Sequence, residues 1–325
     1  MTYTSFSTAS QIVDRFLSVL ASHGISPPRG NVIETELLSA VELLDCIKHP
    51  QTAASRPSLL AEAGGMADLA AKILAVETQS EFHSFLPHLQ LFASKEKWAS
   101  SVQTTSGSAT DDVHRKLNEL YLGSLAIHIG FNVALDHPHA SRGDNPDVMF
   151  DFSFDGQPAK RWALAIKTIS SQSGQTIFER IAEASRQINA TECVAERGIV
   201  VINTQGSLNH SHHWSAHYSS LEDASNTLAD EIRTLIKKAH ENRDDSEWED
   251  LLSGKTSPIV LYLGHTVTHI ATPLSNATPS ILKVALCDSP VARQDEEALA
   301  IAHGINHYMQ VITEGIPGDN GQQPR

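Results

Sequence analysis

The chain has 325 residues, which is long enough to bury a hydrophobic core without disulfide bonds or structural metal. Its formal net charge of -14 at pH 7 argues against a protein that coats nucleic acid non-specifically, because Lys and Arg supply most of that affinity. The charge does not exclude an enzyme that collects divalent cations on carboxylates, since bound cations reverse the local field toward phosphate.

The cysteines and the N-terminal segment indicate the compartment. Cys46, Cys193 and Cys287 are widely spaced and form no CxxC pair, which argues against a disulfide scaffold or a zinc finger and favours a reducing compartment. Asp14 and Arg15 interrupt the first apolar stretch, no basic leader precedes it, and no segment approaches the roughly 18 apolar residues that span a bilayer. We therefore expect a cytoplasmic protein with no membrane partner.

Residues 8–94 carry apolar side chains at helical spacing, as in Ile12, Phe16 and Leu20. A Ser/Thr/Gly-rich stretch follows at 98–112 and is typical of a linker. We accordingly predict four segments: a helical N-terminal domain at 1–97, a linker at 98–110, an α/β domain at 111–315 and a flexible tail at 316–325.

The pattern changes after the linker. It predicts a helix at 111–129, three strands at 131–136, 147–154 and 161–168, a helix at 175–190 and a strand at 198–203. Further along, it predicts a helix at 221–240, strands at 257–264 and 281–288, and a helix at 294–313. The fold class that follows is α/β.

Two of the predicted strands carry polar residues on one face. Because side chains alternate along a strand, Asp147 lies opposite a face of phenylalanines, and Lys167 shares a face with Ala163 and Ala165. Neighbouring strands could therefore bring Asp147 and Lys167 to a common point, with the alanines leaving room for a ligand.

Three short motifs occur in this region in a fixed order. Asn145-Pro146-Asp147 precedes one strand, Ala165-Ile166-Lys167 ends the next, and Arg186-Gln187-Ile188 lies on the following helix. Taken alone, Asn-Pro-Asp is typical of a turn, and a lysine at a strand end is typical of a solvated sheet edge. Together they resemble the PD-(D/E)XK nucleases, whose restriction-endonuclease-like core has the order αβββαβ. The resemblance covers less than a third of the chain.

The resemblance implies a site for Mg²⁺ or Mn²⁺. Asp147 would be a metal ligand, Ile166 would offer its backbone carbonyl to the metal, and Lys167 would orient the attacking water. Glu119 matches an acid that many members carry on the first helix, and Gln187 matches a glutamine on the later one. These oxygen ligands suit Mg²⁺, which keeps several waters of its own.

Position 165 departs from the family pattern, because Ala165 stands where the family has Asp or Glu. Some members place this acid on the following helix. On a helical wheel, Glu183 lies on the same flank as Arg180 and Gln187, and Glu179 points further away. Glu183 is therefore the candidate for the relocated ligand, with Glu179 second.

The leading hypothesis is a metal-dependent endonuclease that hydrolyses phosphodiester bonds in DNA, in restriction or defence. Its N-terminal helices would serve recognition or self-association. Self-association would make the protein a homo-oligomer. The first alternative is a catalytically inactive nuclease fold that binds nucleic acid or protein. The second is an interaction protein with no nucleic-acid partner.

Histidines offer a rival site. His210, His212, His213 and His217 lie in one short segment, and a further pair occurs at 137 and 139. If the segment is helical, His213 and His217 have the i, i+4 spacing of transition-metal ligands. Clustered loop histidines without an acid are more often exposed polar residues, so the sequence favours the carboxylate site.

Overall fold

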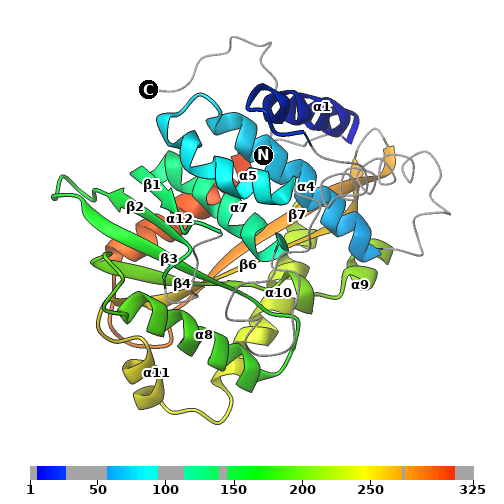
Figure 1. Cartoon of the computed structure of the whole chain (residues 1–325). Coiled ribbons are helices and arrows are strands. Elements are labelled where there is room, and N and C mark those ends of the chain that lie inside the picture. The colour runs from blue at the N-terminus through cyan, green and yellow to red at the C-terminus, as the bar shows by residue number, and fades with distance from the viewer. Residues whose placement is uncertain (1–5, 27–56, 94–112, 139–144, 273–274, 312–325) are drawn as a thin grey trace, which may run out of the picture.

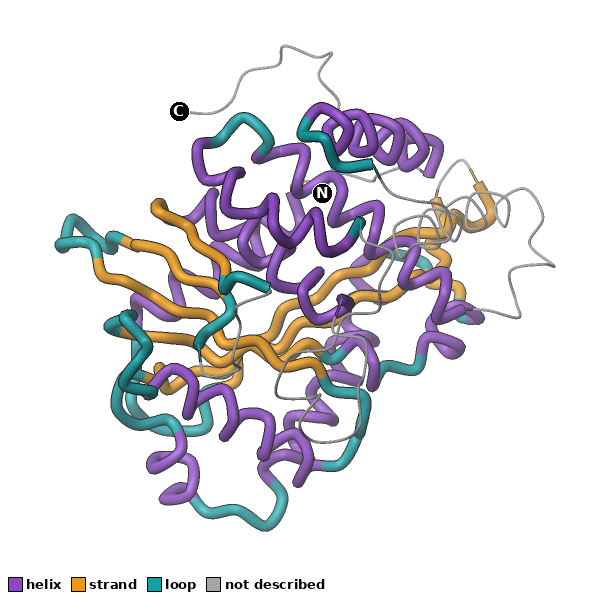
Figure 2. Tube along the Cα trace, viewed as in Figure 1, coloured by secondary structure: helices purple, strands orange, loops and turns teal. Residues whose placement is uncertain are grey.

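The computed structural model describes residues 6–26, 57–93, 113–138, 145–272 and 275–311. The described residues form a seven-stranded sheet with helices on both of its faces (Figures 1 and 2). The fold class is therefore α/β, as predicted.

The strand order is β1-β2-β3-β4-β6-β5, and β7 pairs with the other edge of β6. The first three strands are antiparallel, β3, β4 and β6 run parallel to one another, and β7 runs antiparallel to β6. The strand bounds are β1 Phe131–Leu135, β2 Val148–Phe152, β3 Lys160–Thr168, β4 Arg197–Asn203, β5 His217–Tyr218, β6 Thr256–Thr272 and β7 Ser275–Asp288.

The helices divide between the two faces of the sheet. We call these the α7 face and the α8 face, after the helix that covers β3 on each side. The helices of the α7 face are α1 Phe6–Ser22, α4 Pro57–Val76, α5 Leu86–Phe92, α7 Val113–Ile129 and α12 Glu296–Val311, with the 3-10 helix η1 Ser80–Phe85. The helices of the α8 face are α8 Gly174–Asn189, α10 Leu221–His240 and α11 Asp245–Leu251. The short helices η2 Gln205–Ser207 and α9 His210–Ser215 follow β4.

Alternation along the strands sorts the core into two clusters. On β3, Trp162, Leu164 and Ile166 join the cluster of the α7 face, while Ala165 joins the cluster of the α8 face. Neighbouring strands sort their side chains in the same way. The large side chains of β3 therefore meet α7, and its small ones meet α8.

The predicted elements from residue 113 onward are confirmed to within a few residues. Two predicted strands are longer than expected: β6 continues to Thr272, well past 264, and β7 begins at Ser275, before 281. The short elements η2, α9, β5 and α11 were not predicted. The second half of β6 has a mixed polar and apolar sequence, and its pairing with β7 stabilises it as a strand.

The N-terminal helices share a core with the sheet. Phe16 of α1, Leu69 of α4 and Leu89 of α5 belong to the same hydrophobic cluster as Leu125 of α7 and Leu164 of β3. The predicted linker at 98–110 and the tail at 316–325 lie outside the described residues. Of the helices in the described ranges, none combines the length and the apolar character needed to cross a bilayer.

Candidate functional site

Asp147 lies directly before β2, and its carboxylate contacts the backbone of β3. The Oδ2 atom accepts a hydrogen bond from the Ile166 backbone N–H at 2.6 Å, and the Asp147 N–H donates to the Leu164 carbonyl at 3.1 Å. The residue is buried. Its side chain is therefore held one residue away from Lys167, at the C-terminal end of β3.

Glu119 of α7 lies close to Asp147. Glu119 is buried, and its carboxylate pairs with Lys116 at 2.6 Å and with His88 at 2.9 Å. Burial, and after it the negative charge of Asp147, raises the pKa of Glu119 well above its ordinary value. Glu119 is thus a buried acid with a second acid nearby.

Lys167 contacts the other layer of helices. Its amine lies 2.8 Å from the Glu183 carboxylate, and Arg180 contacts the second oxygen of Glu183 at 2.7 Å. Burial opposes ionisation of Glu183, but these two cations hold its pKa below the ordinary value. Lys167 therefore pairs with a side chain of α8, whereas Asp147 lies near Glu119 of α7.

The space above the alanines of β3 is filled. Ala165 is fully buried and belongs to the same cluster as Ile181 and Ala184 of α8. The expectation that the alanines leave room for a ligand is therefore wrong: α8 lies over Ala165, and Ala163 is buried against Cys193 and Ala195 in the loop after α8. A short residue at 165 is what allows this helix to approach the sheet.

The remaining predicted residues lie along α8. Gln187 is buried, whereas Glu179 is exposed and accepts a hydrogen bond from Gln175 at 2.8 Å. Glu179 therefore lies away from the Asp147 carboxylate, and Glu183 is the acid of this helix that lies next to Lys167.

The two acids are compatible with one magnesium ion. Within the described ranges, no three His, Cys, Asp or Glu side chains come close enough together to hold a metal. Mg²⁺ needs only one or two carboxylates, because it keeps several waters. Glu119 and Asp147 are the neighbouring acids here, and both oxygens of Glu119 also contact Lys116.

The histidine segment does not have the geometry that a helix would give it. Helix α9 ends at Ser215 and His217 lies in β5, so the predicted i, i+4 spacing is wrong. His213 pairs with Glu231 at 2.7 Å, and His210 contacts Thr266 at 2.9 Å. These contacts give both side chains a structural role. Residue 139 lies outside the described ranges.

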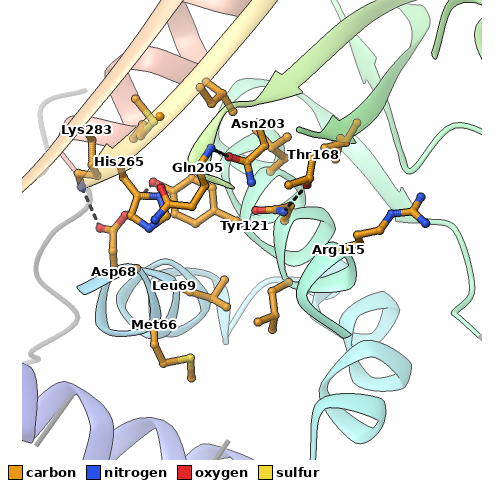
Figure 3. Close-up of a pocket in the computed structure, with 18 of the residues that line it drawn as sticks. Met66, Asp68, Leu69, Arg115, Tyr121, Thr168, Asn203, Gln205, His265 and Lys283 are labelled. Atoms are coloured by element: carbon orange, nitrogen blue, oxygen red, sulfur yellow. Dashed lines mark hydrogen bonds and ion pairs between the residues drawn. The ribbon is translucent and has the colours of Figure 1, made fainter. Parts of the chain in front are cut away.

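Sequence reasoning missed a cavity of about 290 Å³ on the α7 face (Figure 3). The cavity lies between α4, α7 and the strands β6 and β7, where β3 and β4 reach their C-terminal ends beside the middle of β6. Thr168 and Asn203 line it at the two strand ends, and His265 lines it from β6. Polar residues directly after apolar strands were the signal that could have revealed it.

At one side of the cavity, a buried carboxylate is paired with two lysines. Asp68 of α4 contacts Lys283 of β7 at 2.8 Å and accepts a hydrogen bond from the Tyr121 hydroxyl at 2.7 Å (Figure 3). Lys72 lies 3.3 Å from the same carboxylate. Burial opposes ionisation of Asp68, but the two lysines hold its pKa below the ordinary value.

Three comparisons with known proteins returned no match: no family model fits the chain, and no curated protein or solved structure is significantly similar to it.

Proposed function

We propose that the chain is a metal-dependent nuclease with a restriction-endonuclease-like core formed by α7, β1, β2, β3, α8 and β4. The order and directions of these elements support the proposal, because they are those of the αβββαβ core. The observation that carries it is the pair of buried carboxylates, Glu119 and Asp147, beside the strand that ends in Lys167.

In this proposal Glu119, Asp147 and the carbonyl of Ile166 hold Mg²⁺ or Mn²⁺. The bound ion supplies an acidified water and neutralises charge on the phosphate. Two acids that lie close together in a buried site repel each other, so a divalent cation would stabilise both of them.

In this proposal Lys167 contributes a positive charge at the C-terminal end of β3. It lies immediately after Ile166, whose N–H is bound by Asp147, and the ion pair with Glu183 holds its amine. An ammonium fixed near the reacting phosphate stabilises the charge that develops there. We assign Glu183 as a positioning residue for Lys167, and Gln187 as part of the helix surface behind it.

DNA is the proposed substrate, and a cytoplasmic role in restriction or defence is the proposed setting. The test incubates the full chain with supercoiled plasmid, linear duplex and single-stranded DNA, with Mg²⁺, Mn²⁺ or EDTA. We expect cleavage that requires the metal and falls on the order of 100-fold in Asp147→Asn, Glu119→Gln and Lys167→Ala.

Asp151→Asn is the matched control. Asp151 lies in β2, four residues after Asp147, but it pairs with Arg161 at 3.1 Å and takes no part in the proposed site. Cleavage by the control and none by Asp147→Asn, with unchanged thermal melting, supports the proposal. Metal-independent cleavage, or full cleavage by Asp147→Asn, contradicts it.

The second candidate is a catalytically inactive nuclease fold that binds nucleic acid. Ala165 supports it, because this buried residue removes one expected carboxylate and α8 leaves no room for a replacement there. The inactive fold predicts that the chain retains labelled DNA in gel shifts with Ca²⁺ and cleaves none of it with Mg²⁺.

A further inference from the structure

The cavity on the α7 face supports an inference that does not depend on phosphodiester hydrolysis. Ligands of open α/β sheets bind outside the carboxyl ends of the parallel strands, and this cavity lies at the ends of β3 and β4, beside the middle of β6. Among the residues assigned to the nuclease site, only Ile166 also lines it.

The walls of the cavity are mainly apolar. They are formed by side chains of α4, α7, the three parallel strands and α12, among them Leu69, Leu122, Ile166, Leu263 and Met309. The volume of about 290 Å³ is at the lower end of the range of about 300–1,000 Å³ for small-molecule sites. The cavity therefore suits a compact ligand with one or two rings.

The acid beside the cavity is already paired and offers no free charge to a ligand. The Asp68 carboxylate is already matched by Lys283 and by the Tyr121 hydroxyl, so a charged ligand would have to compete with an existing buried pair. The hydroxyl of Tyr121 is engaged, which leaves its ring to face the cavity. Figure 3 shows Arg115 pointing away from these groups.

Asn203 provides a hydrogen-bond donor to the cavity. The residue is only 8% exposed, and its carboxamide oxygen accepts the Gln205 backbone N–H at 3.0 Å. That hydrogen bond fixes the orientation of the amide, and its nitrogen has no partner among the described residues. This nitrogen is not fully enclosed, so it can donate a hydrogen bond to water or to a ligand in the cavity.

Gln205 adds a second carboxamide to the same wall. Its side-chain oxygen is enclosed and has no hydrogen-bond partner in the part of the chain that the structure describes. Figure 3 shows Gln205 grouped with Asn203 and His265 between the helices and the strands. Two neighbouring carboxamides can offer a hydrogen-bond donor and an acceptor to one edge of a planar ligand.

We propose that this cavity binds a nucleobase, either as a free nucleoside or as a base turned out of a nucleic-acid strand. A base has an uncharged, flat body that packs against apolar walls and the Tyr121 ring. Its edge carries adjacent donors and acceptors, which carboxamides of Asn and Gln pair with directly.

The test measures binding to the full chain by calorimetry in EDTA, so that no cleavage contributes. The probes are adenosine, guanosine, cytidine and thymidine, with toluene as an apolar probe that has no hydrogen-bonding edge. Single-stranded oligonucleotides with one abasic position, compared with intact ones, distinguish a base in a strand from a free nucleoside.

We expect one nucleoside, or an intact oligonucleotide in preference to its abasic form, to bind at one site per chain. Gln205→Met and Asn203→Leu should each weaken that binding about tenfold while leaving toluene binding unchanged. Gln205→Met is the more secure variant, because no hydrogen bond of the Gln205 side chain is lost among the described residues.

Gln175→Met on α8 is the matched control and should bind as the wild type does, since Gln175 is exposed on the other face of the sheet. The inference is overturned if no base-containing probe binds, if only toluene binds, or if Gln205→Met and Asn203→Leu bind the base as tightly as the control. Loss of DNA cleavage in the separate assay would leave this result unaffected.

Discussion

The two faces of the sheet are packed with side chains of different sizes. On the α8 face, β3 presents Ala165 and β4 presents Val200, and helix α8 lies close against them. On the α7 face, β3 presents Trp162, Leu164 and Ile166, and the helices there enclose both a cavity and several buried charged groups.

The difference shows where this molecule can accommodate a ligand. Small side chains do not leave space if a helix can move in to fill it, and the α8 face is filled in this way. Both candidate sites, the acid pair and the cavity, accordingly lie on the side with the larger side chains.

The largest expected effect comes from Ala165→Glu, which restores the acid expected at this position. Because Ala165 is fully buried under α8, the new carboxylate would have no room and no water, and we expect a loss of about 4 kcal/mol or more in the free energy of unfolding. Urea denaturation measures it. Ala165→Ser is the control with a smaller polar change.

A stable Ala165→Glu protein with increased Mg²⁺-dependent cleavage would contradict this description of the α8 face, since the space over β3 would then be open.

Gly174→Ala tests how closely α8 approaches α10. A Cβ atom at position 174 would overlap the backbone oxygen of Lys238, and backbone atoms cannot rotate away. We expect a loss of about 1–3 kcal/mol in the free energy of unfolding, measured by urea denaturation. Gln175→Ala, at the exposed neighbouring position, should have little effect. Equal stability of the two variants would mean that the helices are further apart.

The pH dependence of the free energy of unfolding tests whether Lys72 is a buried charge on the α7 face. Burial lowers the pKa of Lys72 from 10.5 to about 8. Above pH 8 the folded lysine therefore loses its proton while the unfolded one keeps it, so the unfolded state binds more protons and stability rises with pH. We expect a gain of about 2 kcal/mol between pH 7 and 9.5 from this group.

The measurement is denaturant unfolding at several pH values, with Lys72→Met for comparison. The variant lacks the titrating amine, so its stability should rise less over this interval. Parallel curves for the two proteins would show that Lys72 is not the source of the pH dependence.

The smallest expected effect comes from Glu183→Gln. The folded pKa of Glu183 lies below 4.5, so its ion pairs stabilise the fold above that pH and are lost as the pH falls through the lowered value. Because the side chain is 37% exposed, we expect a change below about 1 kcal/mol at pH 7. Denaturant unfolding at several pH values below about 4.5 measures this loss, and the free energy of unfolding of the variant should depend less on pH there than that of the wild type.

Glu183→Gln also separates two roles in the proposed nuclease. A positioning residue for Lys167 should reduce cleavage moderately at every Mg²⁺ concentration. A relocated metal ligand should instead raise the Mg²⁺ concentration needed for half-maximal cleavage. Full cleavage at all concentrations would exclude both roles.

The candidate site was only partly readable from the sequence. The predicted residues lie in two groups: Asp147 contacts the Ile166 backbone and lies near Glu119, whereas Lys167 pairs with Glu183. Among the described residues, no contact joins the Asp147 carboxylate to the Lys167 amine, although the strand pattern had suggested one. The filled space over Ala165 and the cavity at Asn203 were not readable, because both depend on how far helices from distant parts of the chain lie from the sheet.

By itself, the sequence determined the elements from residue 113 onward and the face on which each strand residue lies, because both follow from local periodicity and turn chemistry. Only the tertiary structure decided which face is closed and which encloses a cavity. That outcome depends on α4, α7, α8 and α12 packing against the same sheet, and contacts between segments so far apart in the chain leave no local pattern.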